Sequence, residues 1–409
     1  MKSKLLTSLI LAVLAMHGAA MAADAETMTM SEKPGAPAGG LPFDHAGHID
    51  IGYTNLSESG RFATTPNNFN NRVFDFDRNA VNLHAIDLTL SKLPETGFGG
   101  LVNFTVGRDA DTIAAYGTID KNRGPANGVN QKFDVTQAYL HYATGPLMLI
   151  AGKYVTLAGA EVIKSPSDVN YSRSILFGYA IPFTHTGVRG TYKFSDTFSL
   201  TAGVNNGWDD FQDTNSDKTI EMGLSWAPVK SFALAAQGYT GKEQLSNYFC
   251  APTAACVNPQ KGTRNLIDLV ATFSATEQLT LVLNYDYGSQ GNATLVSGTT
   301  GTAKWEGWAG YANYQINDMW RLSLRGEWFN DKDGYRTVVG PLAAGGPLAT
   351  TGQKWKEATL TLAYLPTKAI EIRAEVRNDW SDQKVFLATD GITQKDSQNS
   401  LGLEAIYKF

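Results

Sequence analysis

Long hydrophobic runs are missing from this chain of 409 residues once its first 22 residues are set aside. No later run reaches about 18 apolar residues, so no transmembrane helix is predicted. Helical apolar stripes are also lacking, although a soluble domain of this size would normally show several. The hydrophobic residues, which make up 43% of the chain, alternate instead with polar ones. We therefore expect an all-β protein.

Cysteine is nearly absent, with only Cys250 and Cys256 in the whole chain. They lie six positions apart in a stretch rich in Ala, Pro, Asn and Thr, which in an exported protein predicts one small disulfide that ties a surface loop. A metal site is not expected there, because two thiols without a nearby histidine do not complete a tetrahedral shell. No cofactor is predicted. The net charge of −5 is mildly acidic and argues against a nucleic-acid partner.

The first 22 residues have the pattern of a secretory signal peptide. Two lysines precede an apolar run that ends at Met16, and small residues follow up to Ala22. Because this run is too short to span a bilayer, we predict cleavage after Ala22 and export of the mature protein. Prolines and glycines in residues 23–46 predict a flexible periplasmic leader, and the folded domain is expected at 47–409.

From Gly47 onward, apolar and polar residues alternate in segments of about ten residues, the length that a tilted strand needs to cross a membrane. In one segment Leu281, Leu283 and Tyr285 share an apolar face. We count sixteen segments, to within two. They are 47–56, 81–92, 99–108, 132–142, 147–157, 183–194, 198–206, 219–227, 232–240, 264–274, 279–288, 303–315, 320–330, 355–365, 369–379 and 398–409.

The connectors between these segments alternate between short and long. Tight turns such as 143–146 and 366–368 alternate along the chain with long polar stretches such as 109–131 and 331–354. Outer-membrane barrels show this asymmetry, with short turns in the periplasm and long loops outside. A soluble sandwich would leave strand edges exposed, whereas a closed barrel satisfies its backbone in lipid. We predict a closed antiparallel transmembrane β-barrel of about 16 strands.

The last nine residues read as a membrane strand that ends on an aromatic ring. Leu401, Leu403, Tyr407 and Phe409 lie on one face of the alternating pattern. This strand is expected to close the sheet onto the first one, with the final ring in the periplasmic aromatic girdle. A terminal Phe409 preceded by Tyr407 also resembles the signal through which the barrel-insertion machinery recognises outer-membrane proteins.

One long connector, 158–182, is more apolar than the others, with residues such as Ile163, Leu176 and Phe177. A loop exposed to solvent would not need so much apolar surface. We hypothesise that it folds into the barrel and narrows the lumen; packing on the rim is the alternative. Its candidate constriction residues are Glu161, Lys164, Asp168 and Arg173.

In each predicted strand, the positions that alternate with the apolar ones should face the lumen, and many of them are charged. Charges at this density are costly in a dry core unless all are paired, so they indicate a water-filled lumen. A paired ladder that stiffens the wall is the alternative for each of them. The near balance of signs predicts neither anion nor cation preference. The candidate pore-lining residues are Lys153, Arg189, Arg321, Arg325, Glu327, Glu357, Glu371, Arg373, Glu375, Arg377 and Glu404.

Several short motifs between 133 and 209 resemble the OmpL-like β-barrel porin family. They include Gly152-Lys-Tyr-Val155, Asn170-Tyr-Ser-Arg173, Asn205-Asn-Gly-Trp-Asp209 and the run from Phe177 to Arg189. The resemblance implies a porin in the outer membrane of a Gram-negative bacterium, through which small hydrophilic solutes or ions diffuse. It implies no catalytic residues and no particular solute. A homotrimer is an expectation by analogy with porins of this size.

Three other functions are weighed against a porin. A lipid hydrolase would need a nucleophile and base, and His185 is the one weak candidate. A receptor or adhesin would have a plugged lumen and would not conduct ions. The acidic run from Asp209 to Asp217 loosely resembles a calcium loop and could be bridged by divalent ions to lipopolysaccharide, although it lacks the central Gly and distal Glu.

Overall fold

The structure is a computed structural model that describes residues 43–58, 72–75, 79–117, 132–243, 261–295, 299–337 and 352–409. The predicted signal peptide, nearly all of the predicted leader and the predicted disulfide of Cys250 and Cys256 lie outside the described residues. Within these ranges, no helix is both long enough and apolar enough to cross a bilayer.

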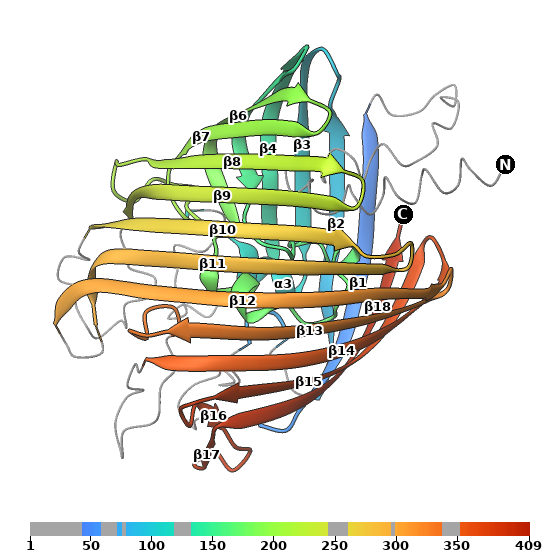
Figure 1. The fold of residues 1–409 in the computed structure, drawn as a ribbon, viewed down its shortest axis with the longest axis vertical. Helices are drawn as coiled ribbons and strands as arrows, with labels where there is room; N and C mark the ends of the chain where they lie inside the picture. The colour runs from blue at the N-terminus through green and yellow to red at the C-terminus, as the bar shows by residue number, and fades with distance from the viewer. Residues whose placement is uncertain are drawn as a thin grey trace.

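Sixteen antiparallel strands form one closed barrel, in which each strand pairs with its neighbours in the sequence and β1 pairs with β18 (Figure 1). The barrel strands are β1 (Asp44–Leu56), β2 (Ala80–Lys92), β3 (Gly97–Val106), β4 (Phe133–Thr144), β5 (Leu147–Val155), β6 (Thr184–Ser195), β7 (Phe198–Asn205), β8 (Thr219–Val229), β9 (Phe232–Glu243), β10 (Gly262–Ser274), β11 (Leu279–Thr294), β12 (Thr300–Asn317), β13 (Trp320–Asp331), β14 (Gln353–Thr367), β15 (Ile370–Ser381) and β18 (Ser397–Lys408).

The predicted barrel is confirmed, including the number of strands. Each predicted segment overlaps one observed strand, and the ends differ by a few residues. Strand β1 begins three residues earlier than predicted, because Asp44 and Ala46 still pair with Ser91 and Thr89 of β2.

Short elements lie between the barrel strands. They are α3 (Arg108–Ile113), η3 (Ser165–Ser167), η4 (Leu176–Ala180) and a separate hairpin of β16 (Phe386–Leu387) and β17 (Gln394–Lys395). The sequence did not predict this hairpin, because strands of two residues leave no measurable alternation.

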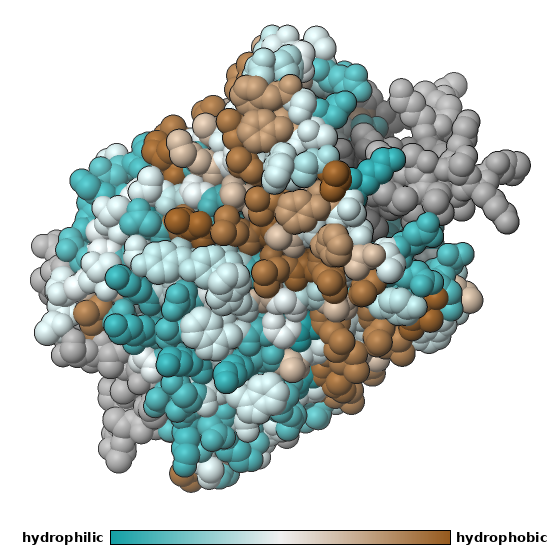
Figure 2. Space-filling model, in the orientation of Figure 1, coloured by the Kyte–Doolittle hydropathy of each residue, from teal (hydrophilic) through white to brown (hydrophobic). Residues whose placement is uncertain are grey.

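Alternation along each strand separates an apolar outer face from a polar inner face. In β15, Ile370 and Ile372 are exposed on the outside, whereas Glu371 and Arg373 are buried inside. Figure 2 shows apolar residues gathered in a band across the outer face, with hydrophilic residues on both sides of it. This distribution is the one that lipid requires, because apolar side chains contact the acyl chains and the closed sheet leaves no strand edge.

The barrel closes where β1 meets β18. The backbone N–H of Gly47 donates to the carbonyl of Phe409 at 2.8 Å, and the N–H of Phe409 donates to the carbonyl of Gly47 at 3.0 Å. The rings of Tyr407 and Phe409 lie 6.1 Å apart at their centroids, and both residues are half-exposed on the outside.

Candidate functional site

The connector between β5 and β6, residues 158–182, lies inside the barrel; we call it the lumen loop. Two separate parts of the barrel wall hold it. From β12, the indole N–H of Trp305 donates to the carbonyl of Ala180 at 3.0 Å. From β1, the Asp50 carboxylate accepts a hydrogen bond from the Ser165 hydroxyl at 2.6 Å. The loop is therefore fixed across the lumen and does not rest on the rim.

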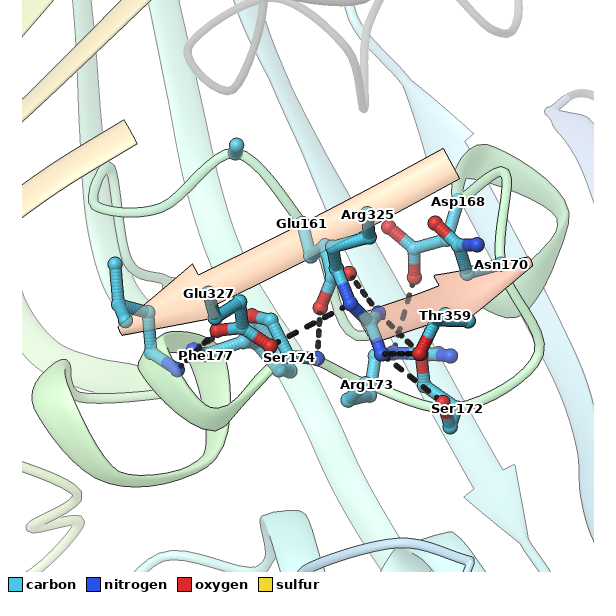
Figure 3. Close-up of polar contacts among 12 residues, drawn as sticks. Glu161, Asp168, Asn170, Ser172, Arg173, Ser174, Phe177, Arg325, Glu327 and Thr359 are labelled. Atoms are coloured by element: carbon cyan, nitrogen blue, oxygen red, sulfur yellow. Dashed lines mark hydrogen bonds and ion pairs between the residues drawn. The ribbon is translucent and has the colours of Figure 1, made fainter. Parts of the chain in front are cut away.

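Arginines of β13 and β15 bind the lumen loop through its carbonyl oxygens, and Figure 3 shows the one from β13, Arg325. Arg325 donates to the Ser172 carbonyl at 2.6 Å and forms an ion pair with Glu161 at 2.7 Å. Arg373 donates to the Asp168 carbonyl at 2.6 Å. The side chains of both arginines have no exposed surface. Each guanidinium carries five N–H donors in a planar fork, so one side chain can satisfy several acceptors of an irregular segment.

Glutamates of the same strands bind the loop through its backbone N–H groups. The Glu327 carboxylate accepts hydrogen bonds from Ile175 at 2.9 Å and Leu176 at 3.1 Å. The Glu375 carboxylate accepts them from Tyr171 at 2.8 Å and from Ser172. A buried loop would otherwise leave these amides without partners, which would cost free energy. The charged wall therefore replaces the hydrogen bonds that a strand neighbour would provide.

An apolar wall on β9 to β14 receives the other side of the lumen loop. Leu176, Phe177 and Ile181 are almost fully buried and belong to one hydrophobic cluster with Trp305 and Phe329. This packing explains why the loop is more apolar than the other connectors. The cluster also makes this side of the lumen dry.

Tyr171 ties the loop to the first two strands. Its hydroxyl lies 2.8 Å from the Thr54 hydroxyl and 2.9 Å from Nε2 of His84. Room for its ring depends on glycine, because a Cβ added at Gly402 would lie 2.4 Å from the ring. The sequence does not mark Tyr171 as an anchor, since a single tyrosine in an irregular connector belongs to no periodic pattern.

Among the described residues, one open space lies between the lumen loop and the wall of β3 to β5, which we call the β3–β5 wall. A cavity of about 40 Å³ separates them. Its polar lining comes from Glu161, Lys164 and Ser167 of the loop and from Asn103, Thr136 and Gln137 of the wall. The sequence did not single out these three wall residues because they are uncharged. Alternation could have found Asn103, but Thr136 and Gln137 are consecutive, and both lie inside because the register between β3 and β4 shifts at this point.

The four predicted constriction residues differ in exposure. Glu161, Asp168 and Arg173 are buried, and Arg173 pairs with Asp168 at 3.0 Å. Lys164 retains 23% side-chain exposure; its ammonium donates to the Thr89 hydroxyl at 3.1 Å and lies 4.0 Å from the Asp87 carboxylate. Lys164 is therefore the member of this set that a solute in the cavity could meet.

Most of the predicted pore-lining charges form ion pairs with inward-facing side chains of the barrel wall, whereas Glu375 accepts hydrogen bonds from the lumen loop. Their pairs are Lys153 with Asp134 at 3.0 Å, Arg189 with Glu221 at 2.6 Å, Arg321 with Glu371 at 2.5 Å, Arg325 with Glu357 at 3.0 Å, Arg373 with Glu404 at 2.9 Å and Arg377 with Glu357 at 3.0 Å. The paired ladder that the sequence left open as an alternative describes these groups.

In the acidic run after β7, carboxylates accept hydrogen bonds from backbone N–H groups. Asp209 accepts hydrogen bonds from the N–H groups of Phe183 and Thr184 at 2.7 and 2.9 Å. Asp213 accepts them from Asn215 and Ser216. Across the described ranges, no three His, Cys, Asp or Glu side chains are grouped to hold a metal ion.

Asp210, in the same connector, is buried and lies close to Glu243. Its carboxylate accepts a hydrogen bond from the Thr214 hydroxyl at 3.1 Å. Burial first, and then the neighbouring Glu243 carboxylate, raise the pKa of Asp210 to about 8.

His185 is held by structural contacts. Its Nδ1 lies 3.0 Å from the Gly207 carbonyl, and its ring stacks on Tyr239 with 5.0 Å between centroids. These contacts bury the imidazole completely. A substrate could not reach it in this arrangement.

Residues 42–409 match the family described as "Putative beta-barrel porin-2, OmpL-like". The chain belongs to this porin family. It is therefore an outer-membrane protein of a Gram-negative bacterium, as the sequence motifs predicted. No curated protein sequence matches it.

Solved outer-membrane barrels share the fold of this porin at low identity. The outer membrane channel DcaP of Acinetobacter baumannii is 15% identical, with a TM-score of 0.57 over 90% of this chain and 97% of DcaP. An anion-selective porin from Comamonas acidovorans is 9% identical, with a TM-score of 0.56 over 90% and 99%. OmpT of Vibrio cholerae, in a trimer form, is 12% identical, with a TM-score of 0.57 over 90% and 99%.

Proposed function

We propose that this porin passes small hydrophilic solutes or ions between the lumen loop and the β3–β5 wall. The observation that carries this proposal is the position of the cavity. Arginines and glutamates hold one side of the loop and an apolar cluster packs against another, whereas the gap at the β3–β5 wall is open and carries polar groups, which supports a route on this side. A barrel of 16 strands alone would be wide, and the loop makes the passage narrow.

Lys164 is proposed to determine the ionic selectivity of this passage. It faces a wall of hydroxyl and amide groups from Thr136, Gln137 and Asn103, with Asp87 as the nearest carboxylate. A single partly exposed cation in a narrow gap acts on every ion that passes, because the field is poorly screened there.

The experiment is a recording of single channels from the refolded protein in a planar bilayer. Small, stable conductance steps that increase after deletion of 162–176 would support a passage narrowed by the lumen loop. Complete silence from a protein whose folding is verified by heat-modifiability would contradict a conducting porin. It would instead support a plugged barrel that acts as a receptor or adhesin.

The plugged barrel is the second candidate, and burial of the charged wall favours it. Arg325 and Arg373 have no exposed side-chain surface, and the cavity beside the loop is small. An enzymatic role is not proposed, because the porin family and the buried, structurally bonded His185 supply no argument for hydrolysis.

Partners outside the chain are also proposals. The trimer form of Vibrio cholerae OmpT supports a homotrimer of this porin. The aromatic end of β18 supports recognition by the insertion machinery, with Phe409 as the terminal ring of the motif. Lipopolysaccharide is the proposed lipid neighbour on the outer leaflet.

A further inference from the structure

A row of large side chains crosses the outer face of β12 to β15. Cross-strand pairing places Trp308 opposite Trp328, Trp328 opposite Lys356, and Lys356 opposite Trp380. All four point away from the lumen, because their neighbours along the strands, such as Phe329 and Glu357, are buried inside. One cation therefore lies among three indole rings on the lipid side of the barrel.

A hollow lies beside this row, on its periplasmic side. Gly310 of β12 and Gly326 of β13 are paired there and have no side chain to fill the space. A Cβ added at Gly310 would meet nothing within 4 Å, and one at Gly326 would meet only the Glu357 carbonyl at 3.9 Å. The hollow has a volume of about 580 Å³. It is lined by Trp308, Gly310, Gly326, Trp328, Lys356 and Trp380, and also by Glu327 and Glu357, whose side chains are buried.

The depth of the row follows from the other aromatic pair on the same strands. Trp320 and Tyr364 pair at the end of β13 and β14 next to the short turns, with 4.7 Å between their centroids. Lys356 precedes Tyr364 by eight positions in β14, which is roughly 26 Å along a strand. The apolar band of an outer-membrane barrel is about 25 Å tall with aromatic girdles at both edges. A strand tilted by about 40° advances only about 20 Å along the membrane normal over this length, so the row lies at the outer edge of the apolar band, from where the long lysine side chain reaches the headgroups.

Apolar shape alone would not select a lipid here, because every acyl chain is as apolar as the hollow. A cation at headgroup level adds a preference for an anionic headgroup. Among the described residues Lys356 forms no ion pair, whereas the nearby acids Asp333 and Asp382 accept hydrogen bonds from the backbone N–H groups of Lys304 and Lys354. Its charge is available to a ligand.

We infer that this hollow binds one acyl chain of an anionic outer-leaflet lipid whose phosphate pairs with Lys356. A glucosamine-phosphate lipid such as lipid A has this chemistry, with several saturated chains below a phosphorylated head. The site is separate from the proposed solute passage, because it lies on the opposite side of the sheet. It therefore does not depend on conduction.

The test is native mass spectrometry of the full-length protein in detergent, titrated with lipid A or with phosphatidylethanolamine. Gly326→Leu fills the hollow and Lys356→Gln removes the charge. Each is expected to weaken lipid A binding about tenfold or more, which corresponds to about 1.4 kcal/mol. The lysine variant should leave phosphatidylethanolamine binding unchanged, because that lipid has no net charge.

Two matched controls separate this site from general effects. Gly238→Leu adds the same side chain at another outward glycine with open space, in β9, where the nearest atom is 3.9 Å away. Lys230→Gln removes an exposed cation at the turn between β8 and β9. Both should bind lipid A as the parent does. Gly310→Leu fills the hollow from the neighbouring strand and serves if the Gly326 variant does not fold.

Two results would overturn the inference. Equal losses in the target and control variants would mean that lipid A binds without a defined site. A Gly326→Leu variant that retains its bound lipid A but dissociates into smaller oligomers would identify the hollow as an interface between copies of this chain.

Discussion

Arg325 of β13 and Glu161 of the lumen loop form an ion pair of 2.7 Å although 164 positions separate them in the sequence. Both side chains are buried, so neither charge can be hydrated if the other is removed. Removal of one partner from such a pair typically costs about 3–5 kcal/mol, because it leaves an unpaired buried charge. This pair is therefore expected to determine whether the lumen loop stays in place.

Arg325→Ala should loosen the lumen loop and lower the stability of the folded barrel. It leaves Glu161 without its guanidinium, leaves Glu357 with Arg377 as its remaining partner, and removes the Arg325 donor from the Ser172 carbonyl. We expect noisy, larger conductance steps and a lower temperature of heat-modifiability in gels. Lys193→Ala removes an exposed pair with Asp196 and should change neither quantity. Unchanged current from the Arg325 variant would mean that the loop is held without this pair.

Lys164→Glu should shift selectivity toward cations by several-fold, because it reverses the sign of a partly exposed charge in the narrow gap. The measurement is the reversal potential in a salt gradient. Lys164→Gln should give an intermediate value. A charge reversal at Lys230, in the turn between β8 and β9, is the control and should leave the reversal potential unchanged. Identical potentials for all these proteins would place the selectivity outside the cavity.

Gly402→Ala should displace Tyr171 and weaken the attachment of the lumen loop to β1 and β2. The added Cβ would come within 2.4 Å of the tyrosine ring, which is far inside ordinary contact distance. We expect increased conductance and faster proteolysis of the loop. Gly326→Ala adds the same methyl group on the outer face, where it meets open space, and should behave as the parent does.

The stability of the connector between β7 and β8, which contains Asp210, should depend on pH in a defined direction. The folded loop raises the pKa of this carboxyl to about 8, well above the usual value of 3.8, so between these values the folded loop holds a proton that the opened loop releases. The free energy of opening should therefore fall as the pH rises from about 4 to about 8 and become constant above that.

Hydrogen exchange of the backbone N–H of Phe211, which donates to Tyr116 at 2.8 Å, measures this opening. Asp210→Asn removes the titration and should make the opening free energy independent of pH in this window. A slope that persists in the asparagine variant would assign the effect to another group, of which Glu243 is the nearest.

The strands could be predicted from the sequence because their signal is local. Alternation identifies β15 directly, where four charges from Glu371 to Arg377 share one face. The contacts of the lumen loop could not be predicted. Glu327 meets Leu176 across 151 positions, and no periodicity relates them. The charges on the inward parity of the strands identified the arginines that bind the loop. Asn103 and Tyr171 are neutral, so this criterion did not identify them.

The seam between β1 and β18 also constrains the order in which the molecule assembles. The lumen loop contacts Asp50 and Thr54 on one side of the seam and Arg373 of β15, which neighbours β18, on the other. These contacts span 115 to 205 positions along the chain, and contacts of such long range are expected to form late in folding. Closure of the barrel and packing of the lumen loop inside it are thus expected to be one cooperative event. An intermediate that has not sealed would present its uncompensated charges to lipid, a penalty that favours completion once insertion begins.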